Sequence, residues 1–174
     1  IAEFAGWMAI LSGILGKMGE DLIQLTQSGI QEVTLGTSGG SSTMPQKSNP
    51  VLPSVLVALA HQNTALNSAI SGAMVHRQQR DGSAWFVEWM SLPQMCMVTA
   101  RGLSAALDLA ETITPNRDRM SAGLDGGMGL VYAEALAFTL TKHMSRPDAQ
   151  SAVKQLCLQA SEQSRHLADL AKES

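Results

Sequence analysis

Apolar residues recur at three- and four-residue steps through the opening part of this chain of 174 residues. This spacing predicts a helix over residues 1–28, with a stripe broad enough to be contacted on several sides. Similar patterns predict helices over 50–75 and 84–110, and the sequence has no alternating run of strand length. The first pattern consists of Phe4, Met8, Leu11, Leu15, Met18, Leu22 and Leu25. The sequence therefore predicts an all-α fold built on long helices.

The third of these helices carries its own start signal and a proline. Ser83 is the expected N-cap, because a hydroxyl can accept a backbone N–H of the first turn. Pro93 removes one backbone donor and is expected to bend the helix. The residues expected on its buried side are Trp85, Trp89, Leu92, Met95, Cys96, Val98 and Leu103.

The remaining part of the chain predicts shorter helices. Thr114 and Pro115 resemble a cap and a first helical position, and further helices are expected over 131–144 and 147–172. Residues 125–129 are rich in glycine and predict a flexible turn. We therefore expect a central helical-bundle portion over 1–110, which contains a loop at 36–50, and a C-terminal helical domain over 111–174.

Composition narrows the functional classes. Apolar residues make up 45% of the chain and charged residues 16%, which predicts that some apolar surface is buried against other chains. A net charge of -3 without a basic cluster argues against nucleic acid as a partner. Cys96 and Cys157 are expected as buried free thiols in a reducing cytoplasm. No apolar run is long enough to span a bilayer, so no membrane partner is expected.

The segment between the first two helices holds groups suited to binding an anion. Gly39 and Gly40 give the backbone freedom, and Ser41, Ser42 and Thr43 supply hydroxyls. Gln46, Lys47 and Asn49 add an amide, an ammonium group and a second amide. A plain Gly/Ser linker is the alternative, but this segment has no repeated Gly, Ser or Pro unit.

The stretch 40–50 reads Gly-Ser-Ser-Thr-Met-Pro-Gln-Lys-Ser-Asn-Pro. It resembles the signature loop of the fumarase/aspartase superfamily, whose members catalyse reversible elimination from succinyl-type substrates. The resemblance implies a long-helix bundle and a homotetramer with active sites shared between subunits. It also implies that Ser41 transfers the proton and that Lys47 and Asn49 bind the substrate carboxylate.

The resemblance gives the other loop residues supporting roles. Ser42, Thr43 and Gln46 are expected to contact substrate, and Gly39 and Gly40 to let the loop open and close. The residues themselves leave two alternatives open: Ser42 or Thr43 caps the helix that starts near Pro50, or Ser41 is only one hydroxyl of an anion cradle.

A second stretch, Arg80-Asp81-Gly82-Ser83-Ala84-Trp85 followed by Glu88-Trp89, resembles the bacterial 3-carboxy-cis,cis-muconate cycloisomerases of this superfamily. The expected reaction converts 3-carboxy-cis,cis-muconate, a tricarboxylate, to 4-carboxymuconolactone in protocatechuate catabolism. The alternatives are a fumarate-releasing lyase, of the adenylosuccinate or argininosuccinate type, and a non-catalytic helical assembly protein. No cofactor is expected.

Several residues outside the loop have two interpretations. Arg80 either binds a substrate carboxylate as a planar pair or forms a surface pair with Asp81 or Glu88, and Arg77 is the competing substrate arginine. Trp85 either packs in the core or forms a wall beside a substrate ring. His61 is expected to be structural, and the four histidines lack the spacing of a metal site.

The chain starts at Ile1, inside a helical pattern, whereas members of the superfamily are longer and carry the signature loop past their middle. We therefore expect these residues to be the C-terminal portion of a larger enzyme. The threonine–histidine region that the superfamily places upstream is missing from them, so the portion alone is expected to be inactive.

Overall fold

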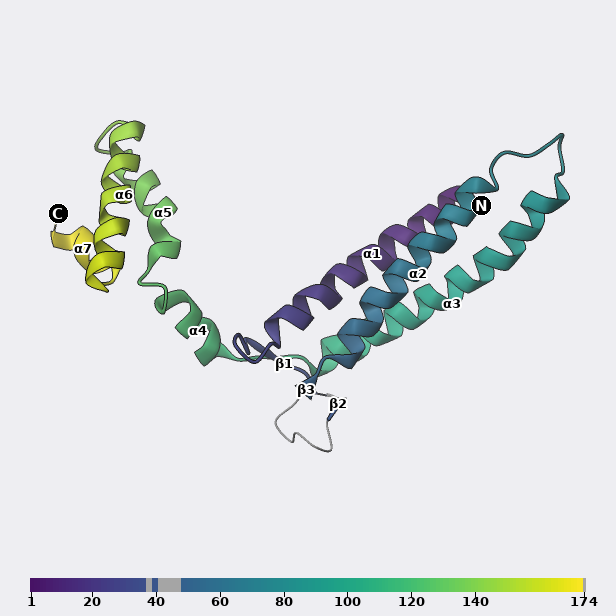
Figure 1. Cartoon of the computed structure of the whole chain (residues 1–174), viewed down its shortest axis with the longest axis horizontal. Coiled ribbons are helices and arrows are strands. Elements are labelled where there is room, and N and C mark those ends of the chain that lie inside the picture. Colours follow the sequence, from purple (N-terminus) through teal and green to yellow (C-terminus); the bar gives the residue numbers. More distant parts are fainter. Residues whose placement is uncertain (37–38, 41–47, 174) are drawn as a thin grey trace. The chain divides into compact units, whose positions relative to one another are not determined.

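The computed structural model describes residues 1–36, 39–40 and 48–173. The prediction of an all-α fold is confirmed. The helices are α1 (Ala2–Leu25), α2 (Val51–Gly72), α3 (Gly82–Thr112), α4 (Arg117–Asp125), α5 (Ala133–Leu140), α6 (Arg146–Gln163) and α7 (Leu167–Glu173), with a 3-10 turn at Leu130–Tyr132. The chain divides into two compact units, residues 1–116 and 117–174 (Figure 1).

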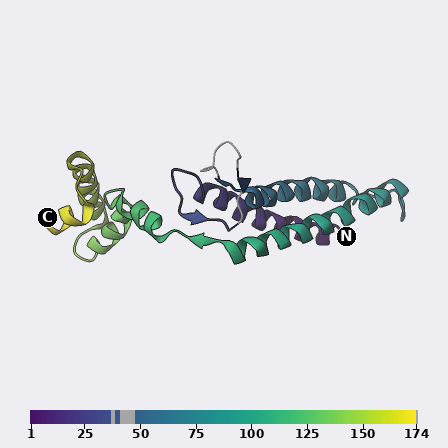
Figure 2. The same ribbon diagram turned by 90° about the horizontal axis from the view of Figure 1, so that it is seen from below.

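Unit 1 is an array of three long helices that run side by side, α1, α2 and α3 (Figures 1 and 2). On α2 the buried residues Leu56, Asn63 and Ile70 stand seven apart, which is the spacing of a seam that faces neighbouring helices over its whole length. At one end of the array, Ala5 and Met8 of α1 pack with Ile70 and Met95. The core of unit 1 is therefore the seam where the three helices meet.

Two glycines let α1 approach α2 closely. A Cβ atom added at Gly19 would lie 2.6 Å from the carbonyl oxygen of Pro53, and one added at Gly16 would lie 2.6 Å from the Cβ of Ala60. Both distances are below any normal contact, so side chains at these positions would force the helices apart. Glycine lowers intrinsic helix stability, and here the close packing of two helices offsets that cost.

A polar cluster lies inside this apolar seam. The side-chain amide of Asn63, which has no exposed area, donates to the hydroxyl of Ser12 at 2.6 Å and to the hydroxyl of Thr99 at 2.9 Å. The hydroxyl of Thr99 donates in turn to the carbonyl of Met95 at 2.7 Å. One residue from each helix contributes to the cluster, so these hydrogen bonds fix the relative register of α1, α2 and α3.

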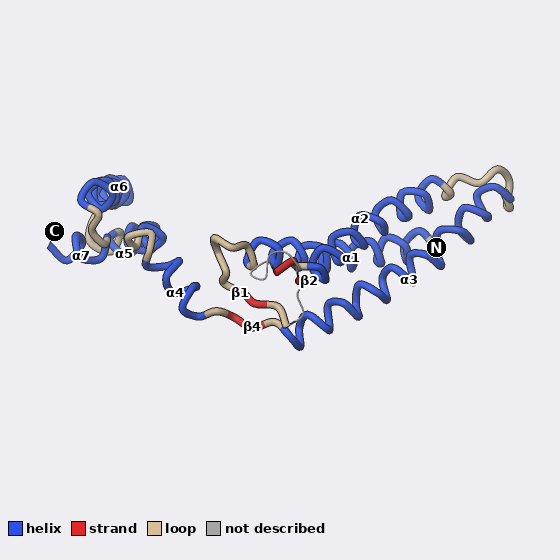
Figure 3. The backbone as a smooth tube through the Cα atoms, turned by 60° about the horizontal axis from the view of Figure 1, so that its bottom comes forward, coloured by secondary structure: helices blue, strands red, loops and turns tan. Residues whose placement is uncertain are grey.

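Two short antiparallel ladders complete the described part of unit 1 (Figure 3). β1 (Val33–Thr34) pairs with β4 (Thr114–Pro115), and β2 (Gly39–Gly40) pairs with β3 (Ser48–Asn49). Thr114 and Pro115 were expected to open a helix, which is wrong: they form β4, and α4 begins at Arg117. Pairing with β1 holds these residues extended, which outweighs their local preference for a helix start.

Unit 2 has a core of Leu156, Ala160, Leu167 and Leu170. One helix was expected over 147–172, but Ser164 takes a left-handed conformation with φ of 51° and ends α6, and α7 starts three residues later. Gly129 has φ of 70°, and an added Cβ would lie 2.4 Å from the His166 ring. The His166 ring leaves no room for a Cβ and the left-handed region disfavours one, so glycine is the residue that fits this turn without strain.

Several residues expected to be buried are exposed. Trp89 is 58% exposed, Leu103 47% and Trp85 42%, because α3 packs against its neighbours along one side only. Cys96 is exposed and Cys157 half-buried, so the expectation of two buried thiols is wrong; both are free. Within the described residues, no helix is long and apolar enough to cross a membrane.

We expect Gly19→Ala to lower the thermal midpoint of the chain, because the new methyl group meets the backbone of α2. The cost is about 1–3 kcal/mol, typical of an overpacked helix contact. Gly13→Ala is the matched control on the same helix, since a Cβ there meets nothing within 4 Å. It should raise stability by about 1 kcal/mol through helix propensity. Thermal unfolding followed by circular dichroism measures both, and equal shifts in one direction would contradict this account of the packing.

Candidate active site

The segment that holds the superfamily loop begins beside the C-terminal end of α3. A Cβ added at Gly36 would lie 2.6 Å from the Cβ of Thr112, so the chain passes directly against that helix end. The N–H of Asn116 donates to the carbonyl of Glu32 at 2.8 Å, next to the β1–β4 ladder. The start of the segment is therefore fixed to the residues that follow α3.

The β2–β3 ladder closes a hairpin in this segment. Gly39 pairs with Asn49 and Gly40 with Ser48, after which Val51 begins α2. The expected site residues Ser41, Ser42, Thr43, Gln46 and Lys47 lie outside the described residues. Of the described ones, Gly39, Gly40 and Asn49 are brought together by the ladder itself.

Asn49 is half-buried beside an open hollow of about 420 Å³. The hollow is lined by Asn49, Pro50, Val51, Ser54, Val55 and Ala58, so its floor is the first two turns of α2. The hydroxyl of Ser54 donates its hydrogen to the carbonyl of Pro50 at 2.8 Å, so it does not offer that hydrogen to a ligand. Asn49 is the residue in this lining whose side chain suits recognition of a carboxylate oxygen.

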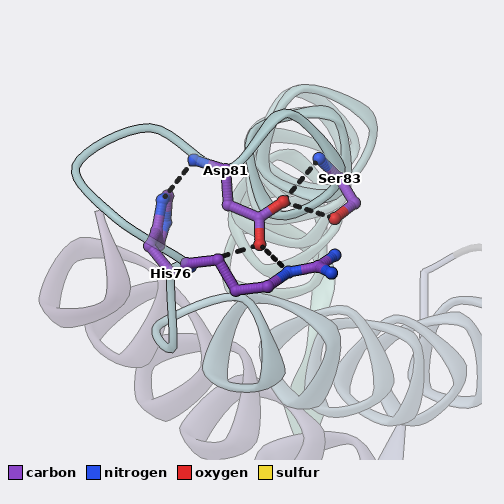
Figure 4. A network of polar contacts seen from close by, with 4 residues as sticks. His76, Asp81 and Ser83 are labelled. Atoms are coloured by element: carbon purple, nitrogen blue, oxygen red, sulfur yellow. Dashed lines mark hydrogen bonds and ion pairs between the residues drawn. The ribbon is translucent and has the colours of Figure 1, made fainter.

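The connection between α2 and α3 is organised by Asp81 (Figure 4). One carboxylate oxygen accepts the backbone N–H of Ser83 at 3.1 Å and its hydroxyl at 2.5 Å. The other accepts the backbone N–H of Arg77 at 3.2 Å and its Nε–H at 3.1 Å. The N–H of Asp81 donates to Nδ1 of His76 at 3.4 Å. The Asp81 carboxylate thus joins the first turn of α3 to Arg77 in the middle of the connection.

These bonds also correct the expected helix start. Asp81, and not Ser83, is the N-cap of α3, since its carboxylate accepts the N–H of Ser83 two residues later. The hydrogen bonds from the Ser83 side chain and then from Arg77 lower the pKa of Asp81 well below its ordinary value of 3.8. Its side chain retains only 11% of its exposed area. Sequence reasoning missed this role, although an aspartate just before an apolar helical pattern is a recognised cap signal.

Arg80 lies next to this network with its guanidinium over an aromatic ring. The guanidinium carbon is 5.8 Å from the centroid of Trp85. Both residues line a cavity of about 180 Å³ with His76, Gln79 and Glu88. Trp85 in turn contacts Trp89 at 5.0 Å between ring centroids, and Phe86 meets Trp89 edge-on at 5.9 Å. Trp85 therefore lines the cavity beside Arg80, and Trp89 and Phe86 extend the aromatic cluster beyond it.

The two groups of candidate residues lie at opposite ends of α2. Asn49 precedes the first residue of the helix and Arg80 follows its last, and the helix has 22 residues. At 1.5 Å of rise per residue it is about 33 Å long. Figure 1 shows the hairpin and the α2–α3 connection at the two ends of the helical array. One copy of the chain cannot bring Asn49 and Arg80 to a single substrate.

The histidines do not form a metal site. Among the described residues no group of three or more His, Cys, Asp or Glu side chains is placed to hold a metal ion. His61 is exposed on α2, and His76 is part of the Asp81 network. His166 accepts the N–H of Ala168 at 3.2 Å and lines an apolar cavity of about 420 Å³ in unit 2 with Tyr132 and Leu136.

Comparison with known proteins defines the class of this fold and site. A sequence model of the lyase family, described simply as "Lyase", matches residues 1–63. The crystal structure of 3-carboxy-cis,cis-muconate lactonizing enzyme from Pseudomonas putida superposes with a TM-score of 0.84 at 34% identity. It covers 97% of this chain, which spans 37% of that enzyme. The chain belongs to the fumarase/aspartase superfamily of lyases.

Within that superfamily the chain is similar to proteins named 3-carboxy-cis,cis-muconate cycloisomerase. It is 37% identical to the one from Acinetobacter baylyi, over 98% of this chain and 38% of the relative. It is 38% identical to the one from Pseudomonas aeruginosa, over 96% of this chain and 37% of the relative. The chain therefore spans well under half the length of the curated relatives that it matches.

We expect the stability contributed by Asp81 to depend on pH in a defined window. Because its pKa is lowered by folding, the contribution is complete above the ordinary pKa of 3.8 and is lost as pH falls below it. Asp81→Asn keeps a capping side chain but cannot titrate. Wild type should therefore lose more thermal stability than Asp81→Asn when the pH is lowered from about 5 to about 3.

The control for this experiment is Asp108→Asn, which removes an exposed carboxylate near the C-terminal end of α3. Asp108→Asn should lose as much thermal stability as wild type between about pH 5 and about pH 3, and more than Asp81→Asn. If Asp81→Asn follows the wild-type curve over the same range, the ionised form of Asp81 does not stabilise the connection.

Proposed function

We propose that the protein to which these residues belong is a cycloisomerase that converts 3-carboxy-cis,cis-muconate to 4-carboxymuconolactone in protocatechuate catabolism. The observation that carries the proposal is the similarity, along nearly the whole chain, to two cycloisomerases of that name. The site adds a chemical reason. A tricarboxylate needs several cationic or amide groups, and both ends of unit 1 present such groups at a hollow or cavity.

In the proposed reaction a substrate carboxylate oxygen bonds to an alkene carbon while the π bond breaks. The electron pair moves to the neighbouring carbon, which lies α to another carboxylate, and that carboxylate takes up the charge as an aci-carboxylate. Ser41 then donates its hydroxyl proton to this carbon and regains a proton from solvent. Overall, one C–O bond and one C–H bond form and one π bond breaks, so the reaction needs no oxidant and no cofactor.

The roles of the loop residues follow from the superfamily motif. Lys47 and Asn49 stabilise the substrate carboxylate and the developing aci-carboxylate, and each such interaction is worth about 3 kcal/mol in a transition state. Ser42, Thr43 and Gln46 make further substrate contacts, and Gly39 and Gly40 let the loop close over them. The β2–β3 ladder supports these roles, since it sets Gly40 and Ser48, the sequence neighbours of Ser41 and Lys47, opposite one another.

We also propose that the active protein is a homotetramer whose sites are shared between subunits. The separation of Asn49 and Arg80 along α2 supports this, because their joint use requires two copies. Exposed apolar side chains on α1 and α3 support it as well, since so many of them on two long helices favour a protein partner. These side chains include Trp7 at 55%, Ile10 at 66% and Ile14 at 63% exposure on α1, and Trp89 at 58% and Met97 at 66% on α3. We place the enzyme in the cytoplasm, where its free cysteines stay reduced.

The proposal is tested by assaying the complete translation product of the gene on 3-carboxy-cis,cis-muconate. We expect loss of the conjugated diene absorbance without release of fumarate. Release of fumarate from a succinylated substrate, with no effect on the muconate, would identify a lyase of the superfamily instead. Absence of both activities, in a protein that assembles, would favour a non-catalytic assembly role.

Ser41→Ala should reduce turnover of the complete product by several orders of magnitude, because the proton donor is removed. Helical content and subunit assembly, measured by circular dichroism and light scattering, should stay as in wild type. Ser28→Ala, outside the superfamily motif, is the control and should keep full activity. A Ser41→Ala protein with wild-type turnover would exclude the assigned role.

Residues 1–174 by themselves should show no turnover of the muconate, because they span less than two fifths of the cycloisomerases that they match. The measurement is the same absorbance assay on purified residues 1–174 at high concentration. Catalysis above the buffer rate would show that the described helices and the loop are sufficient.

A further inference from the structure

The connection between α2 and α3 presents two arginines, Arg77 and Arg80, only three residues apart. Arg80 lines the cavity of about 180 Å³ and Arg77 follows His76, another lining residue, in the sequence; both arginines have the planar group that pairs with carboxylates. The position of the positive charge in the site depends on which of the two arginines binds the substrate carboxylate. The hydrogen bonds of Asp81 distinguish the two residues.

Arg77 is already paired. Its Nε–H and its backbone N–H both go to the same carboxylate oxygen of Asp81, at 3.1 and 3.2 Å. The pair is close to neutral as a unit, so it attracts an approaching anion only weakly. The bond to the backbone N–H also fixes where Arg77 stands relative to the first turn of α3.

Arg80 differs from Arg77 in its partners. Among the described residues it forms no ion pair, and its guanidinium lies over the ring of Trp85. Contact with a ring face leaves the N–H groups at the edge of the guanidinium available for a carboxylate. The chain fold therefore holds Arg80 in place by an aromatic contact that does not use its hydrogen-bond donors.

The other groups at the cavity make Arg80 the fixed positive charge there. His76 accepts the N–H of Asp81 through Nδ1 at 3.4 Å, so this nitrogen is already engaged within the connection. Glu88 lines the same cavity and opposes an anion. A substrate carboxylate at this position thus depends on one guanidinium.

We propose that Asp81 is a positioning residue for the active site: it neutralises Arg77 and fixes the first turn of α3, so that Arg80 alone receives a substrate carboxylate. The assignment rests on the proposed function for the identity of the substrate, but it concerns any carboxylate-rich ligand. Asp81 acts through the two arginines and does not itself touch the ligand.

The test measures binding of propane-1,2,3-tricarboxylate to the complete translation product labelled with fluorotryptophan. Fluorine NMR follows the signal of Trp85, which is assigned with Trp85→Phe. Arg80→Gln should weaken binding about tenfold or more, the usual effect of losing a charge-assisted hydrogen bond. The double variant Arg77→Gln/Asp81→Asn removes the neutral pair and should bind within about twofold of wild type.

Asp81→Asn alone gives the sharpest result. Asparagine caps the helix as well as aspartate does, so the fold of α3 is kept, but Arg77 loses its counter-charge. The tricarboxylate should then bind several-fold more tightly, and adding Arg77→Gln should abolish this gain. In kinetics on the muconate, the same variant should lower KM with little change in kcat, which a purely structural role for Asp81 would not produce.

Three outcomes would overturn the assignment. The first is a Trp85 signal that does not respond to saturating tricarboxylate. The second is a double variant that loses as much affinity as Arg80→Gln, and the third is an Asp81→Asn protein that binds no better than wild type. The binding experiment needs no turnover. If the complete product leaves the muconate unchanged but the variants follow the expected order, the proposed reaction fails and the role of Asp81 stands.

Discussion

The length of α2 is the constraint on which the rest of this structure depends. A helix is stiff because each turn is hydrogen-bonded to the next, so its ends cannot approach one another. The hairpin with Asn49 lies at one end and the connection with Arg80 at the other. Chemistry that needs both ends therefore fits the proposed sharing of sites between copies of the chain, and α1 and α3 both carry large apolar side chains that are exposed in a single chain.

The helical array combines close packing with one polar interaction. Gly16 and Gly19 allow α1 to lie against α2 with no space left for a methyl group. Asn63, Ser12 and Thr99 then bond across all three helices, although the side-chain oxygen of Asn63 has no hydrogen-bond partner among the residues that the structure describes. An unpaired buried carbonyl costs about 1–3 kcal/mol. The cluster thus gives up stability that an apolar seam would keep, and in exchange it fixes one register.

The sequence predicted the long helices because their apolar periodicity is set by the seam that they share. It did not predict which side of α3 would be covered: Trp85 and Trp89 have the spacing of core residues, yet they face outward in a single chain. Periodicity identifies an apolar face but not the molecule that covers it.

Short-range errors had a different cause. Thr114 and Pro115 resemble a helix start, but they pair with β1 as a strand. This pairing joins residues that are far apart in the sequence, so local patterns do not predict it. Ser83 resembles a cap, but Asp81 takes that place and uses its second oxygen for Arg77. The superfamily loop is the opposite case, since its motif in residues 40–50 was readable from the sequence, whereas most of its side chains lie outside the described residues.

The β1–β4 ladder has a consequence for how the two halves of the chain influence each other. β4 ends one residue before Asn116, the last residue of unit 1, and it is hydrogen-bonded to the strand that precedes the hairpin. A pull on the chain at the start of unit 2 is therefore transmitted through a few backbone hydrogen bonds to the base of the loop. Insertions near residue 116 would therefore bear first on the β1–β4 ladder and on the bond from Asn116 to Glu32.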